Sequence, residues 1–267
     1  MSTRIIRDLL ILLAVFGVVW AVFTYFPIFP EENPIDLPFD KEEKLGELFL
    51  EAYLENETVL DNPLVDSAVY VIKERLIDSI GLTEYDYNVM VVQSEEINAF
   101  ATFGGNIVVF SGLISFTERP EELAAVIAHE MGHIEHRHVV DRIIKELGIA
   151  LLFGILTGGD AVLIDEISRT IASTVFDRRQ EEEADEFSLA LLEKCSLSPR
   201  NLGSFFRRLD DKLGGYDRKL EMFMTHPNNM SRIKRSFEYE LSEEFEEQPF
   251  NLDWDLVKQG AGGYAEY

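Results

Sequence analysis

The chain has 267 residues, 46 % hydrophobic and 27 % charged, which is the composition of a protein with a packed core and not of a disordered one. Its 24 basic and 49 acidic residues give a formal net charge of −25, and such a field disfavours binding of nucleic acid because it repels phosphate. The single cysteine, Cys195, excludes a disulfide framework or a cysteine-rich zinc finger within the chain, and it is predicted to be a small buried residue and not a nucleophile.

The first thirty residues contain an uncharged apolar run, Leu9–Phe26. As a helix, its 18 residues would span about 27 Å, close to the hydrocarbon thickness of a bilayer. Arg4 and Arg7 precede the run and acidic residues follow it, so the positive-inside rule predicts a cytoplasmic N-terminus over residues 1–8 and a transmembrane signal anchor over 9–28. A cleaved signal peptide and a buried helix of a soluble domain are disfavoured by the length of the run.

Beyond this run, we predict a proline-rich spacer over residues 29–40, one domain over 41–242, and a loosely held acidic and then glycine-rich tail over 243–267. Apolar spacing predicts helices over 41–55, 64–80, from Pro120 onward, and over about 165–194, 199–213 and 230–241. Two β-prone runs, Tyr87–Val92 and Asn106–Phe110, predict a small sheet, as a hairpin or meander. The fold class is therefore α+β and predominantly helical, preceded by one transmembrane helix.

The helix that begins near Pro120 contains the sequence HEMGH over residues 129–133. His129 and His133 are four residues apart and share a helix face, so both imidazoles can bind one ion. Two imidazoles and a carboxylate suit Zn²⁺ with a position left for water, and Glu130 is placed to take a proton from that water as it attacks a peptide carbonyl. An exposed His/Glu helix face is the alternative, but the apolar segment AAVIA just before the motif indicates a helix that enters a core.

A further histidine six residues after His133 would complete one type of zinc site, but Val139 occupies that position. His136 and His138 are therefore predicted to lie at the surface or to contact a ligand from outside the metal site.

Downstream acidic residues offer another third ligand. Glu181 and Asp185 are four residues apart on a predicted helix, so one could bind zinc while the other accepts the spare N–H of a histidine. Glu182 and Glu186 have the same spacing, and a solvated acidic face would show the same pattern. Spacing alone does not choose among these readings.

Four motifs in order carry a resemblance: INAFA over 97–101, followed by a Gly-Gly pair and SGLI over 111–114; HEMGH; Arg178 with the run to Asp185; and Thr225-His226-Pro227 with Arg232. Over about residues 65–240 the chain resembles the M48 family of zinc metallopeptidases, and its layout is closest to the family's single-anchor branch of Oma1- and BepA-like proteases. The resemblance implies a gluzincin-type metallopeptidase domain with a small sheet.

Carried over residue by residue, the resemblance implies one Zn²⁺ held by His129, His133 and Glu181, with Glu130 as the general base. It implies that Asp185 and Arg232 hold the ligands from outside. His226 would stabilise the oxyanion or close the fourth zinc position. An edge strand would bind substrate through Asn98, Ala99, Phe100 and Ala101.

Two further apolar stretches, Gly148–Leu156 and Ala161–Ile164, lie between the histidines and Glu181. A single membrane crossing there would put His129 and Glu181 on opposite sides of the bilayer, so it is excluded if Glu181 is a ligand. A buried helical hairpin, a flap over the active site and a membrane-dipping loop remain.

These observations together predict a zinc-dependent endopeptidase that cleaves unfolded or damaged envelope or membrane proteins. The expected partners are polypeptide substrates and the lipid bilayer, bound through the N-terminal helix, with no nucleic acid. The catalytic domain is expected outside the cytoplasm, on the periplasmic side of a bacterial inner membrane. The alternative is a zinc-binding but proteolytically silent chaperone-like adaptor at the membrane.

Overall fold

A computed structural model describes residues 37–158, 161–172, 175–212, 226 and 229–262, and a compact unit begins at Leu37. The predicted anchor over 9–28 and most of the predicted spacer therefore lie outside the described residues. Among the residues that are described, no helix is both long enough and apolar enough to cross a membrane.

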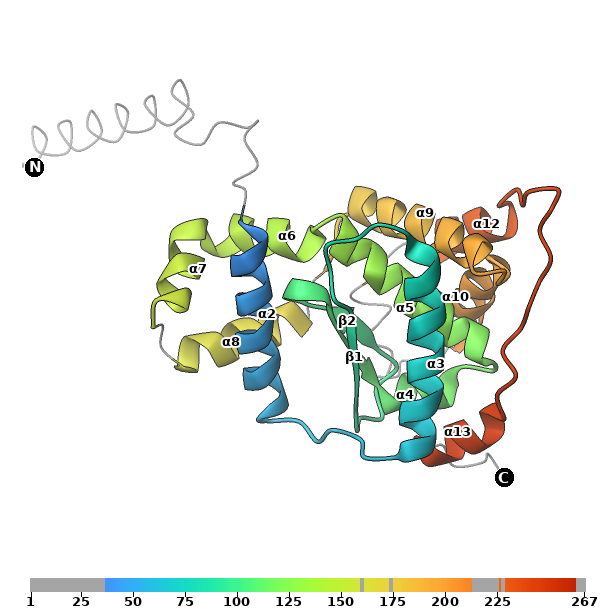
Figure 1. Ribbon diagram of the computed structural model, residues 1–267, viewed down its shortest axis with the longest axis horizontal. Helices are drawn as coiled ribbons and strands as arrows, with labels where there is room; N and C mark the ends of the chain where they lie inside the picture. The colour runs from blue at the N-terminus through green and yellow to red at the C-terminus, as the bar shows by residue number, and fades with distance from the viewer. Residues whose placement is uncertain (1–36, 159–160, 173–174, 213–225, 227–228, 263–267) are drawn as a thin grey trace, which may run out of the picture. The chain divides into compact units, whose positions relative to one another are not determined.

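Helices make up most of this unit (Figure 1), and they pack on both sides of a small sheet. In chain order they are α2 (Phe39–Leu54), α3 (Pro63–Ile80), α4 (Ser111–Phe116), α5 (Pro120–Glu135), α6 (His138–Leu147), α7 (Ile149–Leu156), α8 (Ala161–Ala172), α9 (Arg178–Lys194), α10 (Arg200–Lys212), α12 (Asn229–Phe237) and α13 (Trp254–Gly260). Figure 1 shows α7 and α8 beside α2 at one end of the unit and α10 with α12 at the other, and α2 contacts both α7 and α8.

The sheet has three strands in the order β1-β3-β2, formed by Asn88–Val92, Asn106–Phe110 and Ala99–Ala101 respectively. The predicted hairpin of Tyr87–Val92 with Asn106–Phe110 does not form; β3 instead pairs antiparallel with β2, after a turn where Gly104 takes a positive φ of 67°. The expectation of a simple meander is wrong, because β1 runs parallel to β3, with Asn88 opposite Asn106. The segment after β1 carries the chain past β3, and β2 therefore becomes an edge strand.

The predicted helix over 165–194 is two helices, because α8 ends at Ala172 and α9 starts at Arg178. Asp177 starts the second helix: its side chain accepts from the backbone N–H groups of Arg179 and Gln180, and the Gln180 side chain accepts from the Asp177 backbone. This reciprocal capping box satisfies the free N–H groups of a new helix. The apolar stretches Gly148–Leu156 and Ala161–Ile164, for which three readings were open, lie largely in helices α7 and α8.

The expectation of a loosely held tail is wrong for the described residues after 242. Helix α13 packs against α3 and α4, and Trp254 and Val257 are buried. The indole Nε1 of Trp254 donates to the Thr117 carbonyl, and the backbone N–H of Phe250 donates to Glu121. Burial of the Trp254 side chain stabilises this segment against the domain, although most of its other residues are acidic or polar. Cys195 is buried, as predicted.

Helix α5 lies in the middle of the unit and packs most closely against α9. It begins with Pro120 at its first turn, as predicted, and residues 120–134 are all buried. A Cβ on Gly132 would come within 2.9 Å of the Ala184 backbone, so the absence of a side chain allows this close approach. The Ser188 hydroxyl also donates to the Ala125 carbonyl, which fixes α9 along α5.

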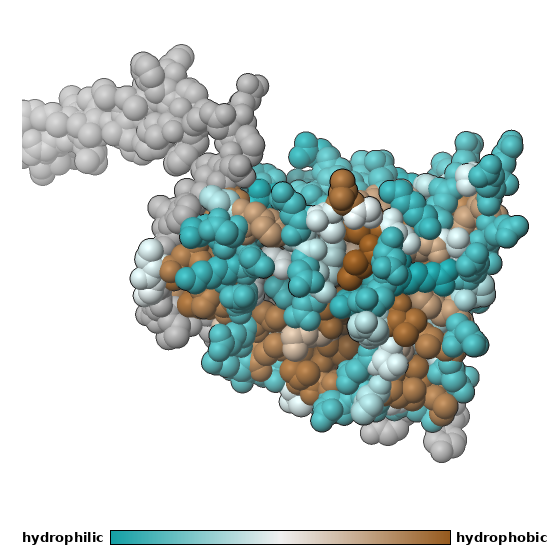
Figure 2. All heavy atoms as spheres, viewed as in Figure 1, coloured by the Kyte–Doolittle hydropathy of each residue, from teal (hydrophilic) through white to brown (hydrophobic). Residues whose placement is uncertain are grey.

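The surface agrees with the acidic composition of the chain. Figure 2 shows hydrophilic side chains over much of this face, with hydrophobic ones gathered in its lower half. Large hydrophobic residues that stay more than two fifths exposed include Val59, Leu64 and Leu256. The residues predicted to bind metal, His129, His133 and Glu181, are all buried instead.

Candidate active site

Helix α5 brings the two histidines of the HEMGH motif together, as their spacing predicted. Their Nε2 atoms lie 3.1 Å apart, and both side chains are 0 % exposed. A fully buried pair of imidazoles is unlike the solvated helix face that was the alternative interpretation.

Helix α9 supplies a carboxylate to the same point. Glu181 lies within 3.6 Å of His129 Nε2 and 3.5 Å of His133 Nε2, and it is also buried. Glu182, which spacing alone could not distinguish from Glu181, points to the surface and pairs with Arg178. The packing of α9 on α5, where Ala184 lies against Gly132 and Ser188 donates to the Ala125 carbonyl, turns Glu181 towards α5.

His226 completes the group. Its Nδ1 lies 2.8 Å from Glu181 Oε1 and 3.4 Å from His129 Nε2. One ligand atom each from His129, His133, Glu181 and His226 all lie within 4.8 Å of one another. Three imidazoles and a carboxylate, converging and shielded from water, form a donor set that fits a divalent metal ion such as zinc.

Asp185 and Arg232 surround this group, as the resemblance implied. Asp185 Oδ1 lies 3.2 Å from His129 Nδ1, the ring nitrogen away from the cluster. The guanidinium of Arg232 donates to both oxygens of Asp185 and lies 2.8 Å from Glu181 Oε2. Burial opposes the charge on Asp185, but Arg232 outweighs it and lowers the pKa of the carboxyl.

Glu130 points to the sheet side of the cluster. Its Oε2 accepts from the Ala101 backbone N–H at 2.9 Å, and its Oε1 lies 3.6 Å from His226 Nε2 with no hydrogen-bond partner in the described part of the chain. Burial raises the pKa of Glu130 to about 7. A buried carboxylate oxygen without a partner needs a donor, and a water molecule or a substrate group would supply one.

His129 and His133 are in the neutral state that metal binding requires. Burial lowers the pKa of His129 to about 4 and also lowers the pKa of His133 and of His138, so these rings are neutral at neutral pH and each offers a lone pair. Burial opposes the charge of His226 too, but Glu181 and Glu130 together raise its pKa.

The predicted substrate-binding residues lie on and next to β2, the edge strand. Asn98 and Ala99–Ala101 are all buried, and both α5 and α8 pack against this strand. The Asn98 carbonyl accepts from Phe110 on β3, whereas the Ala101 N–H points away from β3 to Glu130. Neither side-chain amide atom of Asn98 has a hydrogen-bond partner among the described residues.

Two residues beside His133, Phe176 and His138, were not assigned to the site from the sequence. The ring of Phe176 stacks on His133 with centroids 3.9 Å apart, and His138, which is buried, contacts His133 and Glu183. The spacing from His133 to His138 was visible in the sequence and left His138 as either a surface residue or an outer contact of a ligand. The structure selects the outer contact. Nothing in the local sequence pointed to Phe176.

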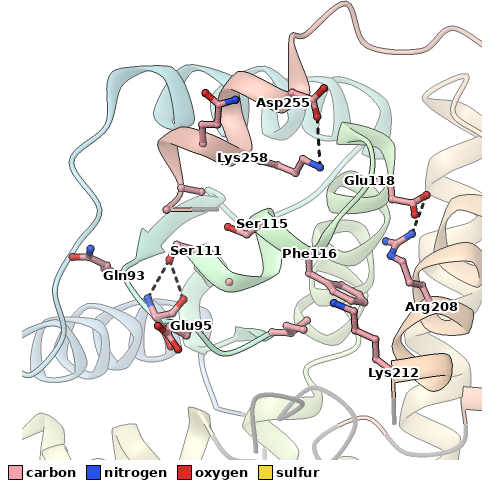
Figure 3. A pocket seen from close by; sticks show the side chains of 16 residues that line it. Gln93, Glu95, Ser111, Ser115, Phe116, Glu118, Arg208, Lys212, Asp255 and Lys258 are labelled. Atoms are coloured by element: carbon pink, nitrogen blue, oxygen red, sulfur yellow. Dashed lines mark hydrogen bonds and ion pairs between the residues drawn. The ribbon is translucent and has the colours of Figure 1, made fainter. Parts of the chain in front are cut away.

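A separate groove of about 980 Å³ lies between α4, α10, α13 and the segment after β1 (Figure 3). Two of its cations pair with carboxylates: Lys258 lies 3.6 Å from Asp255, and Arg208 lies 3.3 Å from Glu118. None of the predicted site residues lines it, so the metal-binding group and this groove are different features of the molecule.

Comparison with known proteins agrees with the geometry. Residues 63–239 match the family model described as Peptidase family M48. The chain is 27 % identical over 210 residues to the beta-barrel assembly-enhancing protease of Yersinia pestis, a match that covers 74 % of this chain and 43 % of that protein. It is 36 % identical over 149 residues to the mitochondrial metalloendopeptidase OMA1 of Arabidopsis thaliana (55 % of this chain, 30 % of that protein).

It is also 33 % identical over 154 residues to the metalloprotease LoiP of Escherichia coli (55 % of this chain, 60 % of that protein). The matches span less than half of the Yersinia and Arabidopsis proteins. Because the family model covers most of the chain and contains every residue of the buried group, the chain belongs to peptidase family M48 and is a metallopeptidase.

Proposed function

We propose that this protein is a zinc-dependent endopeptidase in which His129, His133 and Glu181 hold the ion, Glu130 is the general base and His226 stabilises the oxyanion. The observation that carries the proposal is the buried group of converging donor atoms beside a carboxylate oxygen, Glu130 Oε1, that has no partner in the described chain. A site with donors on one side and an unpaired base on the other suits hydrolysis.

Zinc, when bound, would lower the pKa of a water molecule to about 7 and polarise the carbonyl of the peptide bond. Glu130 Oε1 is free to accept the proton of that water, while the Ala101 N–H holds the other carboxylate oxygen. His226, whose Nε2 lies 3.6 Å from Glu130 Oε1, can donate to the carbonyl oxygen as negative charge develops on it. Glu130 can then pass the proton to the leaving amine.

An extended polypeptide can align along β2, because the outward backbone groups of this edge strand lie next to Glu130. Main-chain pairing gives affinity with little sequence preference, which suits unfolded substrates. Helix α8 packs against β2, so α8 is a flap that must shift before a peptide pairs there.

We propose further that residues 9–28 anchor the chain in a membrane and that the peptidase domain acts outside the cytoplasm on damaged envelope or membrane proteins. Support comes from the apolar run Leu9–Phe26 and from the names of relatives, which include a beta-barrel assembly-enhancing protease. The competing proposal is an adaptor that binds zinc without cleaving protein, and it gives no reason for a buried Glu130 at the cluster.

The first test compares the full-length chain, purified in detergent, with Glu130→Gln for cleavage of casein, an unfolded protein. Loss of a general base lowers the rate by about 10²–10⁴-fold, whereas both forms should contain about one zinc per chain. Equal cleavage by both forms would contradict the role of Glu130. Zinc in both forms without cleavage by either would favour the adaptor.

A further inference from the structure

His133 has an outer partner in His138, the first residue of α6. The two Nδ1 atoms lie 2.9 Å apart, and the His138 Nε2 lies 3.1 Å from Oε2 of Glu183 on α9. His138 is buried, whereas the Glu183 side chain is 36 % exposed. The ring of His138 therefore connects His133, in the metal-binding group, to the Glu183 carboxylate at the surface.

The protons in this series of contacts can be assigned from either end. His133 faces Glu181 and His129 with Nε2, so its proton must be on Nδ1 when Nε2 is a metal ligand. That Nδ1–H can donate only to an unprotonated Nδ1 on His138, which places the His138 proton on Nε2. Nε2–H then donates to the Glu183 carboxylate, and both assignments agree.

We propose that His138 and Glu183 are positioning residues that fix the tautomer and the ring orientation of His133 and thereby raise the affinity of the site for zinc. The inference rests on the proposed zinc site. Outer partners of this kind orient a ligating imidazole and increase its basicity. Phe176 stacks on the face of the His133 ring and keeps the ring from tilting. The ring could still turn within its own plane, and the contact with His138 prevents that motion.

The turn between α5 and α6 explains how His138 reaches its partner. Arg137 takes a left-handed conformation with φ of 54°, which is uncommon for a residue other than glycine. Its guanidinium donates to the carboxylate of Glu42, a buried residue of α2, and to the Leu37 carbonyl. These bonds hold the turn that brings His138 back towards His133.

The test measures the zinc dissociation constant of the metal-free full-length chain by competition with a chelator, for wild type, His138→Leu, His138→Asn and the control His136→Asn. His136 stacks on His138 but does not contact His133 through a hydrogen bond among the described residues. His138→Leu should weaken zinc binding about 10- to 100-fold. His138→Asn should restore most of the affinity, because its side-chain oxygen can accept from His133 Nδ1. His136→Asn should bind like wild type.

Equal affinity of His138→Leu and wild type would overturn the inference while the zinc site stands. Failure of wild type to bind zinc would overturn the proposed function itself, and the inference with it. Thermal unfolding of the metal-free forms shows whether each variant folds. Should His138→Leu not fold, Glu183→Ala takes its place: weaker zinc binding by Glu183→Ala supports the inference, and unchanged binding overturns it.

Discussion

The two histidines of α5 are supported from outside the cluster in different ways. His129 contacts a carboxylate directly, since Asp185 lies 3.2 Å from its Nδ1, and that carboxylate is buried and bound by Arg232. His133 contacts a neutral ring first, and the carboxylate of Glu183 lies beyond it, at the surface. Both carboxylates come from α9, on either side of Ala184.

The two arrangements therefore have different roles: the contacts of Asp185 stabilise the fold, whereas the contacts of His138 affect the metal site. Asp185 is buried close to a second carboxylate, Glu181, and Arg232 stabilises the pair because it contacts both. Removal of that cation should affect the whole fold. The neutral contact through His138 carries no buried charge, so its loss should affect the metal site and leave the fold largely intact.

The largest expected effect follows from removal of the buried cation. Arg232→Leu leaves Glu181 and Asp185 without their shared partner, and breaking a buried ion pair in this way costs about 3–5 kcal/mol of stability. Urea unfolding of the metal-free chain measures the loss. Arg235→Leu is the matched control, because Arg235 is partly exposed, lies 3.4 Å from Asp185, and should cost only about 0–1 kcal/mol. Similar losses in the two variants would contradict the assignment of stability to Arg232.

A smaller effect is expected from forcing α5 and α9 apart, which disturbs both supports at once. In Gly132→Ala the added Cβ meets the Ala184 backbone at 2.9 Å, whereas in Gly154→Ala, on α7, it meets nothing within 4 Å. Both substitutions replace glycine by alanine within a helix and so gain the same helix propensity. The difference between their free energies of unfolding is therefore the cost of the steric clash at Ala184, about 1–3 kcal/mol. Thermal unfolding of the two variants measures this difference in stability. Equal stabilities would mean that α9 moves away from the added Cβ at no cost in free energy.

Much of the site could be predicted because its chemistry is local. The spacing of His129 and His133 places both rings on one helix face wherever that helix lies, and Pro120 indicates where it starts. The choice of Glu181 over Glu182 was not local, since both fit the spacing. It depended on the resemblance, and the structure explains it by the packing of α9 on α5, where Ala184 lies against Gly132.

The incorrect predictions concern features set by distant contacts. Apolar spacing continues across residues 173–177, and only the capping side chains at Asp177 show where a second helix begins. The parallel pairing of β1 with β3 depends on the path of the intervening segment, which composition does not encode. The burial of Trp254 depends on α3 and α4, so an acidic segment was mistaken for a loose tail. His138 could be recognised only after the turn at Arg137 was known.

Zinc content tests the central claim most directly. Wild type, Glu181→Gln and the neighbouring control Glu182→Gln would be purified as full-length chains, dialysed against a weak chelator and measured for bound zinc. We expect about one zinc per chain in wild type and in Glu182→Gln, and almost none in Glu181→Gln, because a neutral amide replaces the carboxylate ligand. Full zinc occupancy in Glu181→Gln, or none in wild type, would contradict the proposed metal site.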